Sequence, residues 1–493
     1  MGTGNAVPLN TKLMYGVGQA AESVKNFGFG TLLLLYYNQV LGLSGTYCGM
    51  AVFIAMAADA ISDPVVGSWS DGTQSRWGRR HPFMLVSILP LGLTFYFLFV
   101  PPQGLSEFSL FVWFATVSVL VRTALTFFHV PYLSMGAELT QDYQERTHVV
   151  VVRTAFGLAA ALVVIAIAWN YFFISTPDNP TPQLTREPYF SYAVLSSFVM
   201  MAMMVICVWG TRHSIPSLAG SRQVARRFNF MQVYTDIYQA LQNPSYRALF
   251  FSTILFFIFA GTHGALAMHL KTFFWQLDTR GIQYWQYGAV LGGILGLPLT
   301  PILNRWVDKK WTVIIGCGGA ALANTGPVLM KMAGLMPTDM SVLVPLLVSL
   351  SALSTISGLQ AAVTVASMMG DIADEHELNH GTRQEGIYFG SYNFSAKCTT
   401  AVGNLVAGFA LDIIHFPVNS KPGGVDDSVL FNFGVMYSSV TLIMIFSTWV
   451  FLSYRLDRKR HEEIMLELRK RQETDPDDSH LQEEEEMTKS PES

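Results

Sequence analysis

Long apolar segments recur along almost the whole chain, and this feature constrains the fold more than any other. A helix needs about 20 mainly apolar residues to cross a bilayer. Twelve segments of this kind lie near 13–41, 47–70, 82–101, 107–137, 149–174, 189–210, 246–275, 284–303, 312–334, 341–369, 386–415 and 429–454. The sequence therefore predicts an all-α membrane protein with twelve transmembrane helices.

The supply of charged residues agrees with this prediction. They make up 13% of the chain, against about 25% in a typical soluble protein. Many of them follow Arg455, so the body before it has too few charges to cover a water-exposed surface. The composition excludes a soluble enzyme and a nucleic-acid-binding protein. The four cysteines lie singly in apolar stretches, so neither a disulfide framework nor a zinc site is expected.

Two other classes of membrane protein are also disfavoured. The sequence contains no triad spacing, HExxH or P-loop, so it predicts neither an enzyme nor a cofactor other than a coupling ion, Na⁺ or H⁺. A membrane sensor would need a signalling domain, and a domain usually has at least about 50 residues. The segments outside the predicted spans are shorter than that.

Basic residues in the loops predict the orientation. Thirteen Lys and Arg residues lie in one alternating set of loops and three in the other. The positive-inside rule places the first set, and with it both termini, in the cytoplasm of a cell that carries the protein in its plasma membrane. The longest loop divides the chain into an N-terminal six-helix bundle (1–210), a middle loop (211–245), a C-terminal six-helix bundle (246–454) and a charged tail (455–493).

Two smaller features accompany this division. The loop after the second span of each half combines Asp, Trp and basic residues, in GSWSDGTQSRWGRRHP (67–82) and NRWVDKKW (304–311). Duplicated halves around a midplane site are typical of secondary transporters. Residues 455–472 are predicted either to form an amphipathic helix on the inner leaflet or to be a solvated helix end before an acidic tail.

Ionisable side chains inside the spans carry the prediction of function. Asp59 and Asp63 are spaced by four and therefore share one helix face. They are either a pair at a helix end in contact with interfacial water or, inside the membrane, a pair that requires a bound cation or a proton. Lys397 lies too deep to reach the interface, so we expect a carboxylate partner, with Asp59 and Asp63 as the candidates. The pattern favours an ion-coupled carrier.

Two further groups remain ambiguous from the sequence. His129 shares a helix face with Thr126, and it is either part of the site or a structural hydrogen-bonding group. Arg153 is either part of the site or close enough to the inner membrane surface to reach water.

At these residues the sequence resembles the glycoside–pentoside–hexuronide:cation symporters of the major facilitator superfamily, whose best-known member is the melibiose permease. The similarity extends over most of the chain. It is carried by KLMYGVGQAAES, NQVLGLSG, DAISDPVVG, SRWGRRHPF, HVPYLSMGAELT, QERT, DIADEHELNHGTRQEGIYFGS and Lys397, in family order. The resemblance implies a major facilitator fold with two six-helix bundles and alternating access.

The resemblance also implies roles for single residues. Asp59, Asp63 and Thr126 match the family's sodium ligands, with Ser62 at a position where a side-chain oxygen is expected. Lys397 matches a lysine that links the two halves electrostatically, and Arg153 matches an arginine near the sugar pocket.

Three positions depart from the sugar-binding pattern of the melibiose permease. His129 replaces an aspartate, Ser23 (with Glu22 beside it) replaces the aspartate that holds a galactosyl unit, and Leu133 replaces a stacking tryptophan. These departures argue against a galactoside. The FHVPY segment resembles the animal sodium-dependent lysophospholipid symporters, so an amphiphilic substrate is the alternative.

The sequence thus predicts a monomeric symporter in the lipid bilayer that moves a small glycoside-like solute with sodium or a proton, sodium being favoured by the hard oxygen ligands. It binds no nucleic acid. We further expect a conformational gate in which basic loop residues join the inner ends of the bundles in the outward-open state. The alternative is that these basic residues only hold the loops in the cytoplasm. Its candidate members are Asp71, Arg76, Arg79, Arg80, Glu138, Arg305, Asp371 and Asp374.

Overall fold

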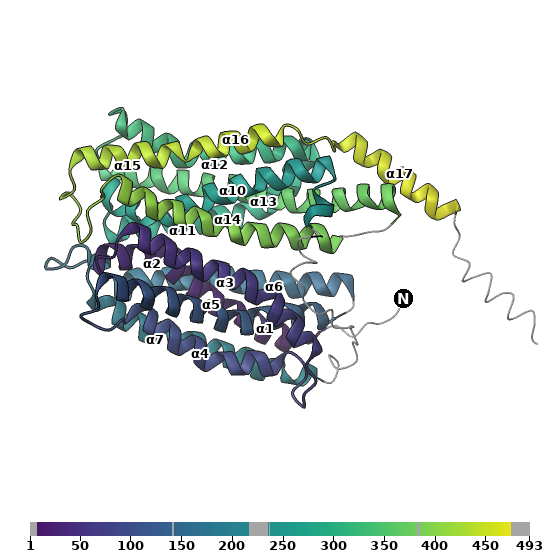
Figure 1. The fold of residues 1–493 in the computed structure, drawn as a ribbon, viewed down its shortest axis with the longest axis horizontal. Helices are drawn as coiled ribbons and strands as arrows, with labels where there is room; N and C mark the ends of the chain where they lie inside the picture. Colours follow the sequence, from purple (N-terminus) through teal and green to yellow (C-terminus); the bar gives the residue numbers. More distant parts are fainter. Residues whose placement is uncertain (1–6, 141, 216–234, 236, 382–384, 475–493) are drawn as a thin grey trace, which may run out of the picture.

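The computed structural model describes residues 7–140, 142–215, 235, 237–381 and 385–474, and over these residues its regular structure is helical (Figure 1). The first half comprises α1 (Leu9–Phe27), the short segments η1 (Gly28–Leu32), α2 (Leu33–Leu35) and η2 (Tyr36–Val40), then α3 (Gly45–Gly72), α4 (His81–Phe99), α5 (Glu107–Glu138), α6 (Tyr143–Ile167) with η3 (Ala168–Phe172), η4 (Pro182–Leu184), and α7 (Glu187–Thr211) with η5 (Arg212–Ser214).

The second half repeats this order. It comprises α10 (Pro244–His269) with η6 (Leu270–Phe274), α11 (Thr279–Trp306), α12 (Lys309–Met332), α13 (Met340–His380), α14 (Glu385–Ile413), α15 (Asp427–Ser439) and α16 (Thr441–Phe451), followed by α17 (Arg458–Thr474). In Figure 1 the helices of the first half lie below those of the second, with their long axes roughly parallel.

Polar residues set the beginnings of many of these helices. The first backbone N–H groups of a helix have no partner within it, and a Ser, Asp or Asn side chain can accept from them. Ser44 caps α3 in this way, Asp142 caps α6, Asn243 caps α10, Asp278 caps α11 and Asp339 caps α13.

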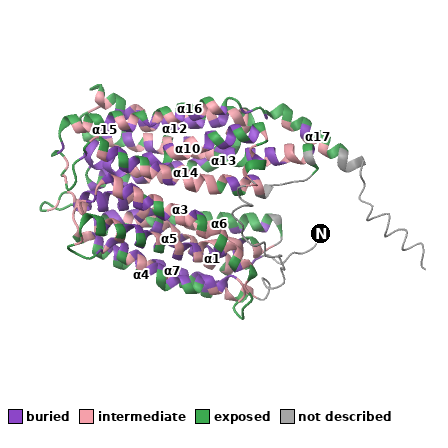
Figure 2. Cartoon of the chain, in the orientation of Figure 1, coloured by how far each residue is buried: buried purple, intermediate pink, exposed green. Residues whose placement is uncertain are grey.

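Within the described residues, ten helices are long and apolar enough to cross a membrane. Their outer faces expose large apolar side chains, including Leu322, Leu442 and Val86, each with about two thirds or more of its surface open. In Figure 2, exposed positions recur along the length of the helices. Water would not tolerate so many, and lipid does. The two other predicted spans, α1 with its continuation to Val40 and α14, are less apolar, and both carry polar side chains of the candidate site.

The two halves use the same helix pairs. In the first half α1 packs on α6 and α7, α4 packs on α5 and α7, and α3 packs on α5. In the second half α10 packs on α14 and α16, α12 on α13 and α16, and α11 on α13, which are the corresponding pairs. Between the halves, α3 contacts α14 and α6 contacts α11. The domain limits at 210 and 245 stay a prediction, since most of the segment between them lies outside the described residues.

The structure corrects two predicted spans. The span predicted at 341–369 belongs to a helix that continues to His380, so Asp371 and Asp374 lie on α13 and not in a loop. The span predicted at 429–454 consists of two helices, α15 and α16, that meet at Val440. The predicted tail helix exists as α17, and it packs on α13 through the fully buried Ile464.

Candidate functional site

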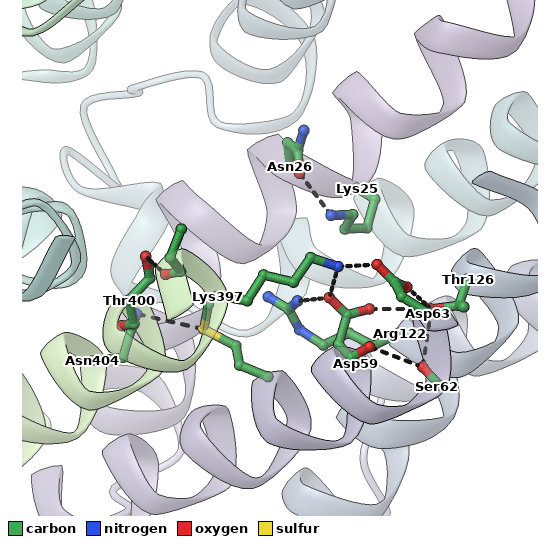
Figure 3. A network of polar contacts seen from close by, with 12 residues as sticks. Lys25, Asn26, Asp59, Ser62, Asp63, Arg122, Thr126, Lys397, Thr400 and Asn404 are labelled. Atoms are coloured by element: carbon green, nitrogen blue, oxygen red, sulfur yellow. Dashed lines mark hydrogen bonds and ion pairs between the residues drawn. The ribbon is translucent and has the colours of Figure 1, made fainter. Parts of the chain in front are cut away.

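The predicted cation ligands lie together at the contact between α3 and α5. The Thr126 hydroxyl oxygen is 3.2 Å from Asp59 Oδ1 and 2.9 Å from Asp63 Oδ1. The Ser62 hydroxyl is 3.2 Å from the Thr126 hydroxyl. Asp59 and Asp63 are one turn apart, as their spacing requires, and α5 packs against the face of α3 that carries them (Figure 3). Side-chain oxygen atoms of Asp59, Asp63 and Ser62 therefore all lie within hydrogen-bonding distance of the Thr126 hydroxyl.

Lys397 reaches this cluster from the other half of the molecule. Its Nζ lies 3.1 Å from Asp59 Oδ2 and also contacts Asp63 Oδ2. Lys397 belongs to α14, which crosses α3. The predicted pairing of the deep Lys397 with Asp59 and Asp63 of α3 is present in the structure. Because the pair joins two bundles, any change in the charge of the carboxylates acts directly on the contact between the halves.

Arg122 is a member of the cluster that sequence reasoning missed. Its Nη1 lies 3.3 Å from Asp59 Oδ2, and its side chain is 13% exposed. Arg122 precedes Thr126 by four residues and therefore lies on the same face of α5. An arginine within the apolar run VSVLVRTALTFF, at this spacing from a proposed ligand, was a signal available in the sequence.

Lys25 on α1 is the second missed residue. It is only 7% exposed, and its Nζ donates to the Asn26 Oδ1 at 2.7 Å. The ammonium lies 5.9 Å from the centroid of the Phe29 ring, and the Arg122 guanidinium lies 5.1 Å from the same centroid. Lys25 also interacts electrostatically with Glu22, Asp59 and Lys397. Two buried cations therefore face one aromatic ring beside the carboxylates.

Glu22 and His129 form a separate contact on the same side of the bundle. His129 Nε2 is 3.0 Å from Glu22 Oε2, and Gln19 contacts the same carboxylate oxygen. Ser23 behaves differently, because its hydroxyl donates to the backbone oxygen of Gly157 at 3.1 Å. The Ser23 hydroxyl therefore serves the packing of α1 on α6, while the neighbouring Glu22 and His129 meet across α1 and α5.

Arg153 is not in the carboxylate cluster. It interacts with Tyr15 on α1, whose ring stacks on Tyr132 at 4.5 Å between centroids. Arg153 precedes Gly157 by one turn, and it therefore lies about one turn of α6 beyond the level of Ser23. The structure thus places Arg153 apart from Asp59 and Asp63, beside Tyr15.

The candidate gate residues lie at one end of the molecule, called here the basic end. It contains the loop 73–80, the residues 139–140 and the residues 307–308. Arg80 is 3% exposed and contacts Asp71 at 2.5 Å and Glu138 at 2.7 Å. Arg79 Nη2 also lies 3.0 Å from Glu138. These partners all belong to the first half.

The corresponding residues of the second half also pair among themselves. Lys309 Nζ lies 2.7 Å from Asp371 Oδ2, and His461 of α17 lies 3.2 Å from Asp374 Oδ2. The Arg305 backbone oxygen accepts from Arg458 at 3.4 Å, and Arg76 is exposed. In this structure the gate residues therefore join segments within each half at the basic end. Their predicted joining of the two halves concerns a different conformation and stays a prediction.

The two halves are joined at the other end, called here the closed end, where the loops 41–44, 173–186 and 414–426 lie. Asp412 of α14 accepts from the backbone N–H groups of Gly45 at 2.8 Å and Thr46 at 2.7 Å. Gly45, Gly49 and Gly408 allow α3 and α14 to touch, since a Cβ on Gly408 would lie 2.2 Å from the Gly45 oxygen. His269 and Asn38 add a contact of 3.0 Å.

The donor set of the cluster fits an alkali cation. Carboxylate and hydroxyl oxygens are the ligands of hard cations, and Asp59, Asp63, Thr126 and Ser62 supply them. Among the described residues, no three His, Cys, Asp or Glu side chains are placed to hold a metal ion. The two carboxylates and the hydroxyls could therefore hold one monovalent cation in exchange for Lys397.

A family model described as "MFS/sugar transport protein" matches residues 14–458. The "Putative glycoside/cation symporter YagG" of Escherichia coli K12 is 23% identical, over 93% of this chain and 95% of its own. The "Sodium-dependent lysophosphatidylcholine symporter 1" of Gallus gallus is 24% identical, over 92% of this chain and 88% of its own.

Solved structures with the same fold include a "Bacterial Homolog to Human Lysosomal Transporter, Spinster, in Inward-facing And Unoccupied Conformation", with a TM-score of 0.63 and 11% identity over 91% of this chain and 96% of that one. The nucleoside transporter NupG, as its D323A mutant, has a TM-score of 0.59 and 12% identity over 90% and 99%. At these identities the likeness concerns the fold alone.

Proposed function

Because the chain belongs to the family of MFS/sugar transport proteins, and is a transporter and not an enzyme, we propose that it carries a glycoside-type solute together with sodium by alternating access. The predicted major facilitator fold is confirmed by these comparisons. The protein is a multi-pass membrane protein. The distant relatives include a putative glycoside/cation symporter and an isoprimeverose transporter.

One observation carries the proposal of cation coupling. The oxygen atoms of Asp59, Asp63, Thr126 and Ser62 converge, and Lys397 bridges to them from the other half. A sodium ion bound at Asp59 and Asp63 neutralises part of their negative charge and so weakens their attraction for Lys397. The contact between α3 and α14 then weakens, and the movement of the halves becomes dependent on the ion.

The position of the contacts between the halves supports alternating access. Within the described part of the chain, the hydrogen bonds that join the halves lie at the centre and at the closed end, at Asp59, Asp412 and Asn38 among others. We therefore propose that this is the conformation closed on one side. Following the basic loops, we propose that the basic end and both termini face the cytoplasm of a monomer in the plasma membrane.

A second candidate, lysophospholipid transport, is favoured by one cavity. An apolar pocket of about 540 Å³ lies between α6 and the helices α11 and α13. It is lined by Leu162, Tyr284, Tyr287, Gly288, Leu291, Ile294, Val344, Pro345 and Val348. An acyl chain entering sideways between the halves would fit such a lining, whereas a sugar would leave its hydroxyl groups without partners there.

The proposal is tested with purified protein in liposomes. An inward sodium gradient should drive uptake of a radiolabelled glycoside, and Asp63→Asn should abolish this stimulation. The matched control is Asp178→Asn, which changes an exposed loop aspartate. Uptake that does not respond to sodium in the unmutated protein, or sodium stimulation that survives Asp63→Asn, would contradict the proposal. Stimulated uptake of a lysophospholipid and of no glycoside would establish the second candidate.

A further inference from the structure

We propose that Lys25 and Arg122 form a binding subsite for an anionic group, so that the solute carried with the cation bears one negative charge. The inference rests on the proposed cation symport and adds the chemical class of the solute. It starts from the charges that surround Asp59 and Asp63.

Lys25 is a buried cation without a carboxylate partner. Its Nζ has one hydrogen bond, to the neutral Asn26 Oδ1, and no ion pair with any residue that the structure describes. A buried ammonium in a membrane protein is costly unless it is paired, and such groups mark substrate or ion pathways. The residue therefore has binding capacity that the protein itself does not use.

Arg122 also has unused capacity. Its Nη1 contacts Asp59, but its Nε is buried and has no hydrogen-bond partner. A guanidinium presents several N–H groups in a plane and suits the two oxygens of a carboxylate or phosphate. Lys25 and Arg122 lie against the same Phe29 ring, at 5.9 and 5.1 Å from its centroid. One ligand group beside this ring can contact both.

The charges of the side chains around Asp59 and Asp63 predict the sign and the number of charges on the solute. Two acids, Asp59 and Asp63, and three bases, Lys25, Arg122 and Lys397, lie in the cluster (Figure 3). Glu22 acts on Lys25 from its contact with His129. With Glu22 counted as the third acid and the imidazole as neutral, the acids and bases balance. A sodium ion at the carboxylates leaves one positive charge in excess, in an environment of low dielectric constant. A solute with a single negative charge restores neutrality. Cation and anionic solute therefore favour each other's binding.

Other basic groups do not supply this subsite. Arg153 interacts with Tyr15, and the buried Lys271 lies over the Trp285 ring at 5.5 Å from its centroid, on a segment near the closed end. The anionic group can belong to an acidic glycoside, as a carboxylate, or to a lysophospholipid, as a phosphate. Both present the same oxygens, and the experiment separates them.

The test is ligand binding by thermal shift and calorimetry, with and without sodium. Two matched pairs are compared: 4-nitrophenyl β-glucuronide with 4-nitrophenyl β-glucoside, and a lysophosphatidylglycerol with the monoacylglycerol of the same chain. Each charged member carries one negative charge. We expect the charged member of one pair to bind about 10- to 100-fold tighter than its neutral partner, the range of a charge-assisted hydrogen bond. Which pair responds identifies the source of the anion.

Lys25→Met should remove this preference, while Lys25→Arg should restore most of it. Lys421→Met, an exposed loop lysine, is the matched control and should keep the preference. Arg122→Lys provides a second variant if Lys25→Met does not fold, and it should reduce the preference without abolishing binding.

The outcomes distinguish this inference from the proposed function. If sodium enhances binding of neutral and charged ligands equally, the cation coupling stands and the anionic subsite is refuted. If Lys25→Met retains the full preference for the charged ligand, the assignment of the subsite to Lys25 is refuted. If sodium changes the binding of no ligand in either pair, the proposed symport itself fails.

Discussion

Replacing Asp412 by asparagine should open the closed end of the molecule. The Asp412 carboxylate joins the halves by accepting from two backbone N–H groups, Gly45 at 2.8 Å and Thr46 at 2.7 Å. These groups begin α3 and have no acceptor within that helix. Asp412, a residue of the second half, thus caps α3, a helix of the first half. Asparagine keeps one acceptor oxygen, but it loses the second oxygen and the charge.

The size of the effect follows from this geometry. A hydrogen bond to a charged group contributes about 1.5–3 kcal/mol, and a negative charge near a helix N-terminus adds about 0.3–1 kcal/mol. Asp412 is partly exposed, so solvent screening favours the lower end of the combined range, about 2 kcal/mol. The ratio of closed to open molecules should fall about 30-fold.

Distances between spin labels measure this ratio. Labels on Gln103→Cys and Leu335→Cys, in exposed loops of the first and second halves at the closed end, report the separation there in a background without the four native cysteines. Asp426→Asn is the matched control, because this aspartate precedes α15 and makes no side-chain cap hydrogen bond. An Asp412→Asn protein with the same distance distribution as the unmutated protein would refute the reasoning.

Three further predictions use other contacts. Gly408→Val should shift the same distances further toward opening, because even the first added carbon would lie 2.2 Å from the Gly45 oxygen; an unshifted distribution would contradict this packing argument. Lys397→Ala should bind sodium and solute separately but lose their mutual enhancement, a coupling of about 1–3 kcal/mol, and full cooperativity by calorimetry would show instead that the pair is a static salt bridge. Arg80→Gln should lower the thermal unfolding temperature more than Arg76→Gln does, because it removes one of the two arginine partners of the Glu138 carboxylate, at a cost of about 1.5–3 kcal/mol, whereas Arg76 is exposed; equal unfolding temperatures would contradict this prediction.

Much of the site followed from local rules. The spacing of Asp59 and Asp63 places them on one face of any helix, and the depth of Lys397 requires a carboxylate, whatever the fold. The structure agrees on both points. The gate residues show the limit of such rules. A basic loop indicates which side of the membrane it occupies. In the structure, however, Arg80 and Lys309 form ion pairs with acidic residues of their own halves. No local sequence pattern specifies these partners.

The sequence by itself determined which segments cross the membrane and which side chains cannot remain there unpaired, because transfer into lipid and helical periodicity are properties of a single segment. The tertiary structure decided which unpaired groups meet. It brought Arg122 to Asp59, left Lys25 beside Phe29 without a carboxylate, and set Asp412 on the first turn of α3. These contacts depend on the crossing of helices that are distant in the chain, such as α3 and α14. That crossing results from the packing of whole surfaces, at Gly45, Gly49 and Gly408, and it is not encoded in the periodicity of either helix alone.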